Sequence, residues 1–248
     1  STLTLLTSSA LAATGVEGKL LYSLDLQAGQ LSHLSITLRN SGAAEETVLL
    51  GLEDLQVTPL NPRYFPSGTL ERSNAAWIKL PASAYTVPGN SSRTVDLTFN
   101  VPANAQPGSY WSALIVQPQA GPVAQGPNVM VNTRYAVQLV TNLAGGAPEV
   151  RFDKPKLGRE NGEVRLALDV LNDGVSATVP AYAVQVYNAG GEVVAQATLT
   201  RKRLYPGGGA HLDFKLGQLP GGRYVFLVTA NDGVNAAAGA RYTVNLKD

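Results

Sequence analysis

The side chains that most often carry catalysis or bind metals are scarce in this chain of 248 residues. It has two histidines, His33 and His211, and no cysteine. A metal site or a Ser-His-Asp triad would need both histidines close together with carboxylates, but they lie far apart in the sequence and in different predicted domains. His33 fits a solvent-facing position on a strand. The absence of cysteine excludes disulfides, zinc–thiolate sites and thiol nucleophiles together.

The acidic residues also lack a catalytic spacing. Glu45-Glu46 and Glu53-Asp54 are adjacent pairs, and neighbouring side chains on a strand point to opposite faces, which is wrong for shared acid–base work. Asn172-Asp173-Gly174 and Asn231-Asp232-Gly233 indicate hairpin turns rather than calcium loops, because alternating carboxylates are missing. The sequence has no phosphate-loop or nucleophile-elbow motif. We predict that the protein is not an enzyme and uses no metal or cofactor.

The composition favours strands and turns. The 25 glycines and 15 prolines recur between short apolar runs, as in a fold of strands and turns. The net charge is +1 with 15% charged residues, so no strong field attracts nucleic acid or an acidic membrane. No apolar run reaches the roughly 18 residues that would span a bilayer.

The clearest strand pair lies at residues 95–101 and 110–116. In the first run, apolar residues alternate with polar ones, which predicts a strand with one buried face. The second run is more continuously apolar, as in a central strand of a sandwich. Five residues are predicted to pack together in the core of this half, namely Trp77, Leu97, Phe99, Tyr110 and Leu114.

The second half of the chain repeats landmarks of the first. The segments 34–42 and 166–174 both end in Asn-x-Gly, and Pro107-Gly108-Ser109-Tyr110 is answered by Pro220-Gly221-Gly222-Arg223-Tyr224. This order predicts two immunoglobulin-like β-sandwich domains in tandem, at residues 16–143 and 149–248, joined by a linker at 144–148. The two tyrosines are either tyrosine corners or plain core aromatics.

The N-terminal residues 1–15 have the character of a leader. The apolar stretch before Ala10-Leu11-Ala12 is typical of the end of a signal peptide with its cleavage site. The alternatives are an ordinary first strand or a disordered leader. On the first interpretation the protein is exported, to the periplasm or the cell surface.

Several pieces of the first half resemble bacterial envelope proteins with immunoglobulin-like domains. The matching pieces are 26–30, 36–42, 76–78 and 101–110. They are similar to the N-terminal domain of PapD-like pilus-assembly periplasmic chaperones, and also to the domain of surface proteins that partner WxL-type proteins. The acidic–arginine motif of the chaperones is replaced here by 103–108, which favours a surface or scaffold relative.

The resemblance implies a mode of binding. Pilus chaperones lend the last strand of their N-terminal domain to a subunit and anchor its C-terminal carboxylate with two basic residues. Here the nearest basic candidates are Lys19 and Arg134. The strand would be 129–140, whose apolar row comprises Val129, Val131, Tyr135, Val137 and Leu139. The alternative is that this strand is paired internally and its apolar row is core.

We therefore predict a non-enzymatic, protein-binding protein of the bacterial envelope, chaperone-like or scaffolding in the assembly of surface structures. Its partners would be other envelope or surface proteins, such as pilus-type subunits. The rival hypothesis is a surface module that binds cell-wall glycan by stacking on Tyr64, Phe65 and Trp77, from a long connection at 56–75 and the strand that follows. A purely structural spacer is the third possibility.

Overall fold

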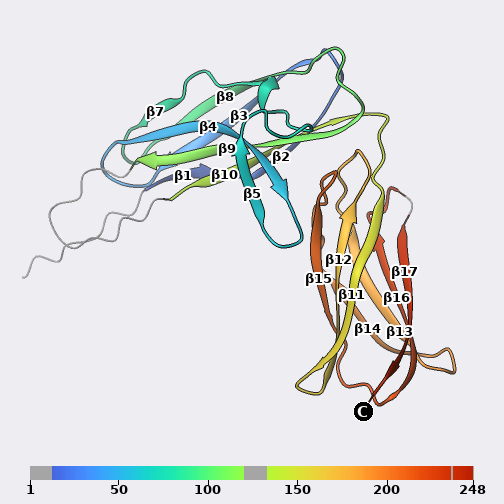
Figure 1. The fold of residues 1–248 in the computed structure, drawn as a ribbon. Helices are drawn as coiled ribbons and strands as arrows, with labels where there is room; N and C mark the ends of the chain where they lie inside the picture. The colour runs from blue at the N-terminus through green and yellow to red at the C-terminus, as the bar shows by residue number, and fades with distance from the viewer. Residues whose placement is uncertain (1–12, 120–132, 236, 248) are drawn as a thin grey trace, which may run out of the picture. The chain divides into compact units, whose positions relative to one another are not determined.

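The computed structural model describes residues 13–119, 133–235 and 237–247 (Figure 1). These residues form strands throughout, with one short 3-10 helix, η1 (Ala75–Trp77). The chain has two immunoglobulin-like β-sandwich domains, so the predicted all-β class is confirmed. The chain divides into two compact units between Thr141 and Asn142, and the short segments Gln56–Arg63 and Pro107–Ser109 group with the second unit.

The first domain contains two sheets. Its strands are β1 (Thr14–Glu17), β2 (Leu21–Leu26), β3 (Leu31–Asn40), β4 (Glu46–Val57), β5 (Pro62–Pro66), β6 (Ile78–Lys79), β7 (Ala84–Val87), β8 (Ser92–Asn100), β9 (Gly108–Gln119) and β10 (Tyr135–Leu143). One sheet has the order β1-β3-β8-β6. The other has the order β2-β10-β9-β4-β5, with β7 also paired to β4.

The core of the first domain follows the period-two pattern of its strands. On β8, Leu97 and Phe99 are fully buried, while the intervening residues face outward. On β9, every residue from Tyr110 to Val116 is buried, as expected of a strand flanked by β10 and β4. The predicted burial of Leu97, Phe99, Tyr110 and Leu114 is confirmed. Trp77 is half-buried, with its ring centroid 4.4 Å from that of Tyr110.

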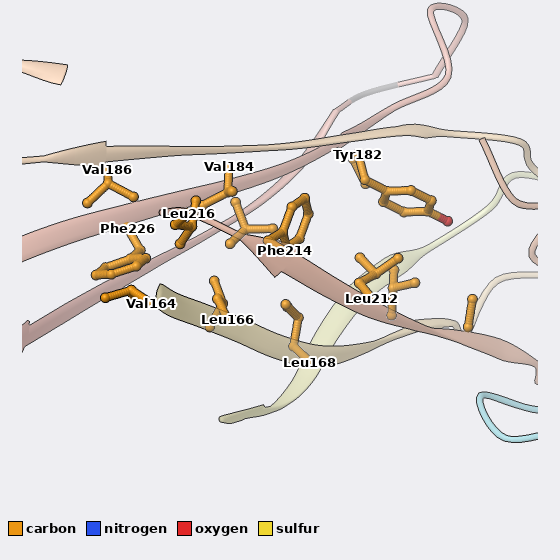
Figure 2. Close-up of a cluster of buried hydrophobic side chains, with 14 of the residues drawn as sticks. Val164, Leu166, Leu168, Tyr182, Val184, Val186, Leu212, Phe214, Leu216 and Phe226 are labelled. Carbon is orange, nitrogen blue, oxygen red and sulfur yellow. The ribbon is translucent and has the colours of Figure 1, made fainter. Parts of the chain in front are cut away.

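The second domain is also built from two sheets. Its strands are β11 (Val150–Glu160), β12 (Glu163–Asn172), β13 (Ala181–Tyr187), β14 (Val193–Leu199), β15 (Gly209–Lys215), β16 (Gly222–Asn231) and β17 (Ala238–Leu246). The sheet orders are β11-β12-β15 and β14-β13-β16-β17. Apolar side chains of both sheets meet in one buried cluster, in which Leu168 and Phe214 of one sheet lie with Tyr182 and Phe226 of the other (Figure 2).

Tyr110 and Tyr224 have equivalent roles in the two domains. The Tyr110 hydroxyl donates to the carbonyl oxygen of Gln106 at 3.1 Å, and the Tyr224 hydroxyl donates to that of Pro220 at 3.0 Å. Each bond reaches back four residues, as in a tyrosine corner. The tyrosine-corner interpretation of both residues is therefore confirmed.

The last residues of the segment 1–15, which was predicted to be a leader, belong to a strand of the first domain. Strand β1 begins at Thr14, inside the segment 1–15, and pairs with β3 from Thr14↔Asn40 to Glu17↔Thr37. The predicted cleavage site at 10–12 lies outside the described residues. In the described part of the chain, no helix is long and apolar enough to cross a membrane.

Candidate partner-binding site

Residues 133–140 of the strand predicted to receive a partner (129–140) are described, and from Tyr135 onward they belong to β10. β10 lies between β2 and β9 in the sheet, so this part of the strand is internal and does not form an edge. Val137 and Leu139 are fully buried. The apolar row therefore belongs to the core at Val137 and Leu139. The prediction that residues 135–139 form an edge of the sheet is wrong. Val129 and Val131 lie outside the described residues.

Tyr135 begins the described apolar row and is half-buried. A side-chain carbon added to Gly15 of β1 would lie 3.2 Å from the Tyr135 hydroxyl oxygen. The phenol ring thus crosses from β10 toward the opposite sheet and rests against the glycine backbone. An alanine at position 15 would require the Tyr135 ring to shift by a few tenths of an ångström.

The internal position of β10 follows from a change of sheet near the N-terminus. β1 pairs with β3 in one sheet, and β2 lies beside β10 in the other. Between them, Gly18 adopts a φ of 96°, a conformation that favours glycine. Just before β2, the carbonyl oxygen of Leu20 accepts a hydrogen bond from the Gln138 amide at 2.8 Å. The terminal strand on this side of the sheet is therefore β2.

β2 is lightly packed for a strand of a sandwich. Of its six residues only Leu26 is buried, and Leu20, directly before the strand, is 50% exposed. Burial of apolar side chains supplies most of the free energy that holds a strand in place. β2 therefore has little fully buried side-chain area, and among the described strands it ends the sheet.

The two candidate anchor residues have different surroundings. Lys19 is exposed in the break between β1 and β2, and it makes no ion pair within the described residues. Arg134, directly before β10, forms an ion pair with Glu53 of β4, and its guanidinium lies 5.3 Å from the ring centroid of Tyr64. The charge of Arg134 is already compensated, so Lys19 is the more available cation for a carboxylate.

The three aromatic residues proposed for glycan stacking are also arranged differently from one another. Tyr64 and Phe65 are neighbours on β5, so their side chains point to opposite faces. Tyr64 is 38% exposed and is covered by Arg134. Trp77 packs on Tyr110 at the margin of the core. Tyr64 is thus the most exposed of the three aromatic residues, although Arg134 lies over its ring. Glycan stacking stays a prediction.

A buried polar group orders the long connection after β5, which the sequence pattern did not indicate. Asp54 is fully buried and accepts hydrogen bonds from the Leu70 amide, at 2.7 Å, and from the Ser73 hydroxyl. Asn74 is also buried, and its amide donates to the Leu139 carbonyl oxygen at 3.1 Å and the Thr141 hydroxyl at 3.0 Å. The position of Asn74 after the stretch with three prolines is the one sequence feature that could have indicated an ordered loop. This loop is thereby joined to β10 from inside the sandwich.

The two histidines lie at exposed positions on strands. His33 is exposed on β3 and lies 3.3 Å from the Thr98 hydroxyl, as its strand position predicted. His211 lies beside Asp169 on the second domain, with 2.8 Å between Nδ1 and the carboxylate. Burial raises the pKa of Tyr205 to about 12 and also raises the pKa of Tyr182. No group of three or more metal-ligating side chains gathers in the described part of the chain.

Comparison with known proteins finds chains of similar structure. No protein-family model matches this chain, and no curated protein matches it. A chain from the chaperone–tip adhesin complex of CFA/I fimbriae is 9% identical, with a TM-score of 0.52 over 93% of this chain and 97% of that one. The class 5 fimbriae chaperone CfaA is 10% identical, with a TM-score of 0.51 over 93% of this chain and 98% of that one. At these identities the likeness concerns the fold. The resemblance to PapD-like fimbrial chaperones is therefore confirmed at the level of the two-domain fold.

Proposed function

We propose that this chain is an exported, non-enzymatic protein of the bacterial cell envelope that binds other proteins during the assembly of surface structures. The observation that carries this proposal is the fold, which aligns over nearly the whole length of two fimbrial chaperone structures. One of those structures is a complex of a chaperone with a tip adhesin. A pilus-type or other surface subunit is accordingly the kind of partner we propose, in the periplasm or at the cell surface.

We propose strand addition at the β2–β10 side of the first domain as the mode of binding. Among the described strands β2 ends the sheet, and strand addition extends a sheet at its last strand. Since β2 buries only one of its residues, a partner strand can also take its place beside β10. Tyr135, which is half-buried at the start of β10, would then lie beside the partner's strand.

Lys19 is the proposed anchor at this site. It is exposed between β1 and β2 and has no acidic partner in the described residues. A lysine ammonium attracts a carboxylate as a point charge. Arg134 is the second candidate, but it must first leave Glu53. We therefore assign the larger effect to Lys19.

Capture of native partners from an envelope extract tests the proposal. The full chain, a Lys19→Glu variant and a Lys215→Glu variant serve as baits, because Lys215 is an exposed lysine of the second domain. We expect the wild type and Lys215→Glu to retain the same envelope protein and Lys19→Glu to lose most of it. Equal capture by all three baits contradicts the anchor. Retention of glycan that Tyr64→Ala abolishes would instead support the glycan-binding alternative, and no capture at all would fit a spacer.

A further inference from the structure

The edge strands of the two domains differ in how they resist pairing with another chain. An exposed edge is usually protected by charge, proline, a bulge or short length. β5 has a proline at each end, and β6 has two residues. Charged residues interrupt β2, β11, β15 and β17. Among the described edges longer than four residues, β14 is the one with neither a charged residue nor a proline.

β14 is regular over most of its length. It pairs with β13 on one side only. The pairing runs without interruption from Leu199 to Ala195 and then shifts by one residue, so that Val193 faces Tyr187. A bulge of this kind discourages further pairing at its own position. Here it lies at one end of the strand and leaves the free edge of residues 195–199 regular.

The bulge also presents apolar area to solvent. Val193 is 48% exposed and Val194 is 42% exposed, and they are adjacent. Along the rest of the strand, Ala195, Ala197 and Leu199 are only partly buried against the core of the domain. A neighbouring strand would therefore remove apolar surface from water as well as pairing the free backbone groups.

The residue order of β14 suits a second copy of itself. Consider two β14 strands that pair antiparallel about a twofold axis at Gln196. Ala195 of each copy then lies opposite Ala197 of the other copy, and Val194 lies opposite Thr198. Valine and threonine have nearly the same shape. Because the strand carries no charge, no like charges are brought together at the axis, which an interface between identical surfaces requires.

We infer that β14 is a self-association edge, through which two copies of this chain pair antiparallel and join their β14-β13-β16-β17 sheets into one continuous sheet. The contact is separate from the β2–β10 side of the first domain and does not depend on the proposed function. A strand of seven residues is smaller than the roughly 20–30 residues per partner of a standard interface. The dimer is therefore reversible, and its population rises with protein concentration.

Sedimentation equilibrium of the full chain over a concentration series, with charge-swap variants, tests this inference. Gln196 is exposed, so Gln196→Lys and Gln196→Glu place a charge at the twofold axis without entering the core. We expect the wild type to move toward twice the monomer mass as concentration rises. Each variant alone weakens association by about tenfold or more, since like charges meet. An equimolar mixture of the two variants restores it.

Thr243→Lys is the matched control, because Thr243 is exposed on β17 at the other edge of the same sheet. This variant associates like the wild type. Circular dichroism verifies that every variant keeps its strands. A wild type that stays monomeric at all concentrations overturns the inference. So does a dimer that the Gln196 variants leave unchanged, or a mixture that associates no better than its components.

Discussion

Asn40 and Asn172 occupy equivalent positions in the two domains and share three equivalent hydrogen bonds. Each is fully buried at the end of its strand, β3 or β12. Each side-chain amide donates to the carbonyl oxygen four residues later and to that of a distant segment, Val87 or Leu204. Each side-chain oxygen accepts from the glycine amide two residues later. The Asn-x-Gly repeat in the sequence is thus a repeated structural device that satisfies the backbone where a strand ends.

Replacement of Asn172 by alanine should destabilise the second domain. The change leaves the backbone groups of Gly174, Ser176 and Leu204 without their buried partner, for which we expect a loss of about 2–4 kcal/mol in the free energy of unfolding. Both tryptophans are in the first domain, so urea unfolding should shift when followed by circular dichroism but not by tryptophan fluorescence. Asn245→Ala, at an exposed position of β17, is the control. Equal stability of the two variants would contradict this role of Asn172.

Phe99→Ala tests the strand register of the first domain. Phe99 is fully buried on β8 opposite Ser32, and its truncation should lower the free energy of unfolding by about 3–5 kcal/mol through lost burial and a cavity. Tryptophan fluorescence during urea unfolding measures this loss. Arg93→Ala, on an exposed position of the same strand, should change stability by less than about 1 kcal/mol. A loss below about 1 kcal/mol for Phe99→Ala would mean that the register is shifted by one residue.

Val137→Lys distinguishes a core strand from an exposed one. Val137 is fully buried in β10 between β2 and β9, so an ammonium group there has neither water nor an opposite charge. We expect the first domain to lose its cooperative unfolding transition in tryptophan fluorescence. Lys19→Glu, at an exposed position, should keep it. A Val137→Lys variant that unfolds at the wild-type urea concentration would show that this row faces solvent.

Asp232 should make the stability of the second domain depend on pH. Burial acts to raise the pKa of its carboxyl group, but hydrogen bonds from Thr178, Asn235 and Val234 outweigh burial and hold the pKa well below its usual value. The folded pKa lies below the unfolded one, so the carboxylate stabilises the domain above about pH 3.8–3.9. This stabilisation is lost as the pH falls through that value toward the folded pKa.

The pH dependence is measured by urea unfolding at pH 7 and at pH 3, followed by circular dichroism. Asp232→Asn should be less stable than the wild type at pH 7, and the difference should narrow at pH 3, where the unfolded wild type binds a proton. Asp213→Asn is a comparison on β15, where the carboxylate pairs with Arg165 at a partly exposed site. A difference between Asp232→Asn and the wild type that is the same at both pH values would contradict the assignment.

Period-two patterns predicted the fold class and much of the core of the first domain. Alternation at 95–101 predicted the buried face of β8, and continuous apolarity predicted the central position of β9. The Pro-Gly step before Tyr110 and Tyr224 marked both as either tyrosine corners or core aromatics, and the hydrogen bonds of the two hydroxyl groups decide for corners. These features are local, so the sequence over about ten residues contains the information they require.

Strand neighbours and site geometry depend on contacts between distant segments. The position of β10 depends on β2, which begins more than a hundred residues earlier, and on the turn at Gly18 that moves the chain between sheets. An apolar row looks the same in the sequence whether its strand is internal or an edge. The pairing of Arg134 with Glu53 and Tyr64 likewise joins three separate strands or strand ends, and no spacing pattern in the sequence specifies it.

Amide hydrogen exchange of the full chain, with and without a captured envelope partner, tests strand addition most directly. Exchange rates report which backbone amides become hydrogen-bonded on binding. The account predicts a change of protection at β2, a gain if the partner's strand pairs with β2 and a loss if it takes the place of β2 beside β10, with the second domain unchanged at equal protein concentration. If protection appears only at β5 around Tyr64, or nowhere in the first domain, binding does not occur by strand addition at this side of the sheet.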